Sequence, residues 1–140
     1  PIELYNNPAT LFVASFIGAP QINLIPVQFK NNKLISGDIE LSGFKDLPEN
    51  TELVLGIRPD VITPNKNGQL EIKVDLVEQH GADNLIYGAL SGAAKADIDD
   101  TEICFKTAQG TLPDIDSVLK LHFDQKTAMI FNKESGERLI

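Results

Sequence analysis

Residue types that often carry catalysis are few in this chain, and they lie far apart in the sequence. The two histidines, His80 and His122, are not accompanied by the three or four converging ligands that a zinc site needs. The single cysteine, Cys104, lies in the strand-like run Glu-Ile-Cys-Phe-Lys with no histidine near it. We therefore predict no metal site and no catalytic residue, and we interpret Cys104 as a structural cysteine of a reducing compartment.

Carboxylates gather at residues 97–102, in the sequence Asp-Ile-Asp-Asp-Thr-Glu. An EF-hand loop needs a glycine at its sixth position and a glutamate at its twelfth, and this stretch lacks both in register. We interpret it as a solvated turn, and residues 134–137 as a surface hairpin tip. Because no Gly-x-x-x-x-Gly-Lys-[Ser/Thr] segment occurs, we expect no ATP hydrolysis by this chain alone.

Length and charge narrow the class of protein further. The chain has 140 residues, of which 42% are hydrophobic, as in an ordinary single globular domain. Its net charge is −8, which disfavours binding to nucleic acid and to anionic membrane surfaces. No apolar run approaches the roughly 20 residues of a membrane span. We therefore expect a soluble, cytoplasmic protein that does not bind nucleic acid.

The elements that would position any site are clearest in the middle of the chain. Residues 53–60 are apolar on both faces until Pro59 removes a ladder donor, which predicts a buried central strand. Residues 70–79 alternate, and this pattern predicts a half-covered strand with one apolar face, made by Leu70, Ile72, Val74 and Leu76. The polar segment 63–68 contains the Pro, Asn and Gly of a reversal, so we predict that the two strands form a pair.

Shorter strands are predicted on both sides of this pair. Residues 23–30 contain Pro26 and are expected to be an edge strand or a bulge. The remaining strands are predicted at residues 34–41, 85–90, 102–107, 118–124 and 128–131, with a hairpin return at residues 138–140. Seven or eight short strands with frequent turns indicate an all-β barrel or sandwich.

The first 18 residues have a different pattern. Asn7 fits an N-cap, Pro8 the first helical position and Gly18 the position after the last turn, so a short helix is predicted between them. This helix has almost no polar face, and the chain begins without Met. We expect a fragment whose missing N-terminal part covers the helix. The alternative is a complete domain that encloses the helix in its core.

Four segments, in the same order along the chain, resemble the ATP-binding subunits of ABC importers. Residues 1–23 resemble the end of the nucleotide-binding domain, and Gly-Ile-Arg-Pro-Asp at residues 56–60 resembles a Gly-Ile-Arg-Pro-Glu segment of the accessory domain that follows it. Residues 74–88 and 131–139 resemble two further segments of that domain. The Leu-Ile-Tyr-Gly version at residues 85–88 is similar to the branch that imports sugars and glycerol 3-phosphate.

The resemblance implies a fold and a role. The fold would be an OB-like β-barrel of the TOBE type preceded by one helix, with residues 1–20 ending the nucleotide-binding domain and residues 21–140 forming the accessory domain. The role would be regulation and dimerisation, without catalytic or ATP-binding residues and without a cofactor of its own. ATP and Mg²⁺ would belong to the absent motor domain. The parent would lie at the inner face of the membrane, with a second copy, permease subunits and a regulatory protein as partners.

The resemblance also places a candidate surface for a regulatory partner at Gly56 and Glu78. The alternatives are close backbone packing at Gly56 and a strand-end carboxylate at Glu78. Asp60 and Val61 depart from the Glu and His that are usual in the family. A different function, a β-barrel that binds small anions or oligosaccharides, remains an alternative, although the net charge of −8 and the absence of Trp argue against it.

Overall fold

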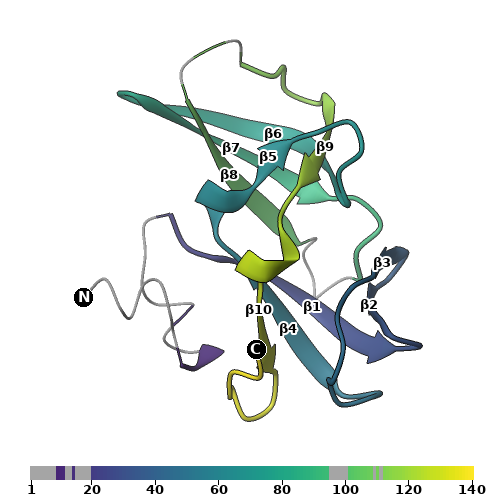
Figure 1. Cartoon of the computed structure of the whole chain (residues 1–140). Helices are drawn as coiled ribbons and strands as arrows, with labels where there is room; N and C mark the ends of the chain where they lie inside the picture. The colour runs from purple at the N-terminus through teal and green to yellow at the C-terminus, as the bar shows by residue number, and fades with distance from the viewer. Residues whose placement is uncertain (1–8, 12–13, 15–19, 95–100, 109, 111) are drawn as a thin grey trace.

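The computed structural model describes residues 9–11, 14, 20–94, 101–108, 110 and 112–140. Over these residues, ten strands form two antiparallel sheets of five strands each (Figure 1). The first sheet has the order β10 (Met129–Asn132), β4 (Glu52–Ile57), β1 (Asn23–Lys30), β2 (Lys33–Ser36) and β3 (Ile39–Leu41). The second has the order β5 (Thr63–Pro64), β9 (Val118–His122), β6 (Leu70–His80), β7 (Asp83–Leu90) and β8 (Glu102–Ala108).

The all-β prediction is confirmed, with more and shorter strands than expected. The predicted strand at residues 34–41 is wrong, because Gly37 takes a left-handed φ of +57° and divides it into β2 and β3. The short helix predicted near the N-terminus falls mainly on residues outside the described ranges. Among the described residues, no helix has the length and apolar content to cross a membrane.

One hydrophobic core lies between the two sheets. β4 gives it Leu53, Leu55 and Ile57, while the second sheet contributes Leu70, Ile72, Val74, Ile86, Ile103 and Phe105. A smaller cluster covers the other face of the first sheet and consists of Ala14, Ile22, Val54, Met129 and Phe131. Both faces of β4 are therefore buried, and the prediction of a buried central strand is confirmed.

The predicted pairing of β4 with β6 is wrong. β4 pairs with β1 and β10, whereas β6 pairs with β7 and β9 in the other sheet. After Ile57 the chain passes through the 3₁₀ turn η1 (Pro59–Val61) and then enters β5, which pairs with β9. Pro59 cannot donate to a ladder, so the chain leaves the first sheet at this point and the next strands build a second layer.

Leu76 does not share the buried face of Leu70, Ile72 and Val74. The register of β6 on β7 shifts between Val74, which lies opposite Gly88, and Leu76, which lies opposite Tyr87. Asp75 is thus the extra residue of a β-bulge, and a bulge changes which residues face the core. The Leu76 residue is 47% exposed, so the predicted position of this residue is wrong.

Pro26 lies in a strand that is central in the sheet order, contrary to the prediction of an edge strand. β1 pairs with β4 from Asn23 to Gln28, but its pairing with β2 covers only Gln28 to Lys30. Pro26 therefore occupies a part of β1 that has a neighbouring strand on one side. A missing N–H group can be tolerated there because it need not enter a ladder.

The predicted C-terminal hairpin is confirmed, and a second tight turn joins β6 to β7. Gly81, with φ of +58°, and Ala82 connect β6 to β7 after the pair of His80 and Asp83. At the other end of the chain, Gly136 N–H donates to the carbonyl oxygen of Asn132 at 2.8 Å. The chain then returns along β10, where Leu139 N–H donates to the carbonyl oxygen of Ile130 at 2.7 Å.

Candidate functional site

Gly56, the first candidate residue, lies inside the first sheet. A Cβ atom at this position would stand 3.0 Å from Ile22 Cδ1 and 3.2 Å from Phe131 Cε2. The absent side chain therefore leaves room for two apolar neighbours of the smaller cluster. This arrangement agrees with close packing at Gly56.

Glu78, the second candidate residue, lies on β6 beyond the bulge, and its side chain is 42% exposed. Its Oε1 accepts a hydrogen bond from the Tyr87 hydroxyl at 3.0 Å, and His80 Nε2 is 3.4 Å away. Burial, followed by the hydrogen bond to Glu78, raises the pKa of Tyr87 above its ordinary value. The phenol thus stays protonated and donates to a carboxylate that is open to solvent.

A pocket of about 320 Å³ is lined by one neighbour of each candidate residue, Ile22 beside Gly56 and Tyr87 beside Glu78. It is lined by Tyr87, Glu102 and Cys104 of the second sheet and by the segment 20–24 that leads into β1. Ile22 belongs to that segment and packs beside Gly56, while Tyr87 bonds Glu78. We call the group formed by Glu78, Tyr87, Glu102, Cys104 and residues 20–24 the Tyr87 face.

The chain segment over this cavity is fixed by Asn23, which is 4% exposed. Its Nδ2 donates to the carbonyl oxygen of Cys104 at 2.8 Å, and Cys104 N–H donates to its Oδ1 at 2.7 Å. One amide side chain thereby satisfies both backbone groups of Cys104 and ties β1 of the first sheet to β8 of the second. No local sequence pattern could indicate this contact, because the two residues are far apart along the chain.

Two further groups of the Tyr87 face have shifted pKa values. Burial raises the pKa of the Cys104 thiol to about 11, so it is protonated at neutral pH and is not a ready nucleophile. The pKa of Glu102 rises to about 7, first because of partial burial and then because of a hydrogen bond with Asp75 and the negative charge of that residue. The buried position of Cys104 agrees with its structural interpretation.

The remaining predicted positions do not assemble into a site. His80 lies at the β6–β7 hairpin, and His122 lies on β9 with its side chain exposed as expected. Residues 95–100, which hold most of the acidic stretch, are outside the described ranges. Within those ranges, no three His, Cys, Asp or Glu side chains are grouped in a way that could hold a metal ion.

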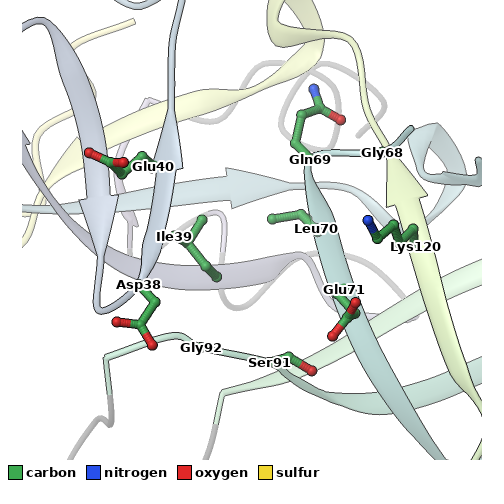
Figure 2. Close-up of a pocket in the computed structure, with 10 residues that line it drawn as sticks. All are labelled: Asp38, Ile39, Glu40, Gly68, Gln69, Leu70, Glu71, Ser91, Gly92 and Lys120. Carbon is green, nitrogen blue, oxygen red and sulfur yellow. The ribbon is translucent and has the colours of Figure 1, made fainter. Parts of the chain in front are cut away.

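A polar groove of about 500 Å³ opens between the two sheets on another side of the molecule. Figure 2 shows Asp38 and Glu40 on one wall and Glu71 and Lys120 on the other. The walls are held by backbone bonds, in which Asp38 N–H donates to Gly92 O at 2.7 Å and Ser91 N–H to Glu71 O at 2.8 Å. Sequence reasoning missed this groove, because its residues come from separate strands and turns.

Comparison with known proteins gives relatives for nearly the whole chain, although no protein-family model matches it. The chain is 53% identical over 139 residues to the sn-glycerol-3-phosphate import ATP-binding protein of Roseobacter denitrificans. It is 33% identical over 146 residues to the protein of that name from Ruegeria pomeroyi and 32% identical over 149 residues to that from Escherichia coli K12. Each match covers 99% of this chain but only 38% or 39% of the relative.

Proposed function

We propose that this chain, a relative of the sn-glycerol-3-phosphate import ATP-binding proteins over about two fifths of their length, is an accessory domain of an importer's ATP-binding subunit. The observation that carries the proposal is the 53% identity over 139 residues, which leaves almost no part of the chain unmatched. The domain would be of the OB-like TOBE type, and two sheets around one core support that assignment. Residues 1–20 would belong to the end of the nucleotide-binding domain.

The proposed domain is not catalytic. The chain lacks a phosphate-binding loop of the Walker type, and its one thiol is protonated in the Tyr87 face. ATP and Mg²⁺ would bind in a motor domain elsewhere in the parent, which would couple ATP hydrolysis to solute uptake. The accessory domain would influence the motor domain by helping to hold it near its second copy, and it would take no part in the hydrolysis reaction.

Its proposed partners follow from this placement. A contact between two copies would raise the effective concentration of one motor domain for the other without a new chemical step. The parent would lie at the inner face of the membrane through its permease subunits. A regulatory protein would dock on the Tyr87 face, where Glu78 is exposed and where Gly56 supports Ile22 beneath the surface.

The proposal is tested by exchanging segments between relatives. The aligned residues of this chain replace their counterparts in the Roseobacter denitrificans protein, and ATP-dependent uptake of glycerol 3-phosphate is measured in cells that lack their own importer. We expect uptake close to that of the unaltered protein. A matched exchange that also carries Leu55→Asp disrupts the core and should abolish uptake. A chimera that is produced and assembles normally but does not support uptake would refute the proposal.

A second candidate function is supported by the groove between the sheets. Its volume of about 500 Å³ and its mixture of carboxylates, an amide and an ammonium group suit a polyhydroxylated ligand. Titration with maltose tests this oligosaccharide-binding role. Saturable binding that Glu71→Gln weakens would favour it, and the absence of heat or of shifted resonances at millimolar maltose would exclude it.

A further inference from the structure

Residues 9–11 lie along the C-terminal hairpin, although the two segments are far apart in the sequence (Figure 1). Three antiparallel backbone contacts join them, and these pair Leu11 with Gly136, Thr10 with Glu137 and Ala9 with Arg138. The outer two are hydrogen bonds, of 2.8 Å from Leu11 N–H and of 3.2 Å from Arg138 N–H. One register over three successive residues is the way in which strands pair in a sheet. We call residues 9–11 and 136–138 together the clasp.

The hairpin return is held by β10 on its other side. The carbonyl oxygen of Glu137 accepts from Asn132 N–H at 2.8 Å, and Leu139 N–H donates to the carbonyl oxygen of Ile130 at 2.7 Å. Because the backbone groups of successive strand residues point to opposite sides, the residues that alternate with these two bind residues 9–11. The clasp therefore extends the edge of the first sheet beyond β10.

The turn of the hairpin is fixed by its own contacts. Ser135 N–H donates to Asn132 Oδ1 at 2.9 Å, and Glu137 N–H donates to Ser135 Oγ at 3.2 Å. Gly136 has a φ of +77°, in the left-handed region that favours glycine. These contacts do not involve residues 9–11, so the hairpin presents a preformed edge to them.

Side-chain packing also holds the early part of the chain on the first sheet. Ala14 is 0% exposed and belongs to the smaller cluster, together with Met129 and Phe131 of β10. Leu11 is partly buried against the same cluster. Ala14 N–H donates to the carbonyl oxygen of Thr10 at 3.0 Å, which connects the buried residue to the clasp. Apolar burial therefore adds to the directional backbone contacts.

We propose that the clasp is a rigid joint through which the C-terminal hairpin fixes the motor domain of the parent on the first sheet of this domain. The inference rests on the proposed function, in which residues 1–20 end the nucleotide-binding domain. A flexible linker leaves two domains free to reorient, whereas a segment held by backbone bonds and a buried cluster does not. A movement of the motor domain is thus passed directly to the accessory domain.

A rigid joint also gives the proposed contact between two copies its effect. A contact at one end of a molecule raises the effective concentration at the other end most when the connection is short and stiff. The clasp supplies such a connection from residues at both ends of the described chain, 9–11 and 136–138. Loosening the clasp should therefore weaken the cooperation of two motor domains without touching an ATP site.

The first test is a crosslink within the 140-residue chain. Thr10→Cys and Glu137→Cys together place two thiols at opposite positions of an antiparallel bridge, where Cα atoms lie about 4.5 to 5.5 Å apart, within reach of a disulfide. We expect mild oxidation to join them within one chain, as shown by peptide mapping without reduction. The control combines Thr10→Cys with Asn67→Cys, in the exposed turn before β6, and should not crosslink within one chain. Cys104 is buried and stays reduced.

The second test opens the clasp by substitution. Leu11→Asp places a carboxylate against the apolar smaller cluster, which cannot solvate it. The Arg138 amide, which bonds to residues 9–11, should then exchange its hydrogen about tenfold faster, whereas the Leu139 amide, which bonds to β10, should keep its rate. Leu76→Asp makes the same change at an exposed position and should alter neither amide.

The third test uses the chimera of the Roseobacter denitrificans protein, purified with its transporter in liposomes. Leu11→Asp should lower ATP-dependent uptake about tenfold, and the oxidised pair Thr10→Cys and Glu137→Cys should restore it, because the disulfide closes the clasp again. If the chimera without substitutions does not support uptake, the importer role fails, whereas the crosslink and the exchange rates still report on the clasp.

Two results would overturn the inference. The thiols at positions 10 and 137 may not join under conditions in which the chain stays folded, which means that the clasp does not form. The Leu11→Asp chimera may assemble, show the faster exchange and yet transport as well as the Leu76→Asp chimera, which means that the clasp is not a joint between the domains.

Discussion

β4 and β6 were both predicted to bury apolar side chains, but β4 and the outer half of β6 lie in opposite environments. Every residue of β4 after Glu52 is buried, because the main core covers one face and the smaller cluster covers the other. β6 is buried on one face only as far as Val74, and the bulge at Asp75 then turns Leu76 outward. β4 is thus buried on both faces, whereas the outer half of β6 forms part of the solvent-facing surface.

The two regions should differ most in how far a leucine-to-alanine substitution lowers the free energy of unfolding. Leu55→Ala removes a side chain with 0% exposure and should lower the free energy of unfolding by about 2–5 kcal/mol. Leu76→Ala makes the same chemical change at 47% exposure and should cost no more than about 0.5 kcal/mol. Urea denaturation of both variants measures the difference. Equal destabilisation would mean that the outer half of β6 is covered as β4 is.

The side-chain contact of Asn23 in β1 with Cys104 in β8, which joins the two sheets, should be the next most sensitive feature. Asn23→Ala removes both hydrogen bonds to the backbone of Cys104 and leaves a buried N–H and C=O without that partner. We expect a loss of about 1–3 kcal/mol in the free energy of unfolding, measured by urea denaturation. Asn67→Ala, in the exposed turn before β6, is the matched control and should change stability little. A small effect at both positions would contradict the tie between the sheets.

The bulge itself can be tested at the residue that faces it. Gly88 lies opposite Val74, and a Cβ atom there would stand 2.5 Å from the backbone oxygen of Lys73. Gly88→Ala should therefore force the β6 backbone to move and cost about 1–3 kcal/mol. Gly110→Ala, where no atom lies within 4 Å of the added Cβ, should not destabilise. Hydrogen exchange should show faster opening of β6 in Gly88→Ala but not in Gly110→Ala.

The contrast between β4 and β6 also shows how much of the fold could be predicted from the sequence. The burial of β4, the β6–β7 turn and the C-terminal hairpin follow from hydrophobic pattern and turn residues, which act locally. The bulge at Asp75 and the pairing of β4 with β10 depend on contacts between distant segments, so alternation along one strand cannot reveal them.

The residues of the Tyr87 face could likewise be predicted only in part from the sequence. Glu78 was found through a resemblance, but its partner Tyr87 and the amide of Asn23 enter only through pairing of the strands. Arg58, Lys126 and Arg138 line one pocket although they come from separate segments, because β10 pairs with β4.

The smallest expected effect is a pH dependence confined to the Tyr87 face. The pKa of Glu102 is raised to about 7 from its ordinary value of 4.5, so the folded chain binds a proton that the unfolded chain has already released between these values. Stability should therefore fall as pH rises from about 5 to about 7, and the penalty should persist above that range. Because Glu102 is exposed to water, we expect a contribution of only about 0.2–1 kcal/mol.

Glu102→Gln should remove this dependence, and Asp75→Asn should reduce it by removing the neighbouring negative charge. Urea denaturation at pH 5 and pH 8 measures the effect, with Glu49→Gln as a control of equal charge change on the exposed surface of the first half of the chain. If the stability of Glu102→Gln and that of Glu49→Gln change with pH by the same amount, Asp75 of the bulge is not coupled to Glu102 of β8. If they differ, the bulge that exposes Leu76 also places Asp75 against Glu102, and the outer half of β6 differs from β4 in its charge interactions as well as in its burial.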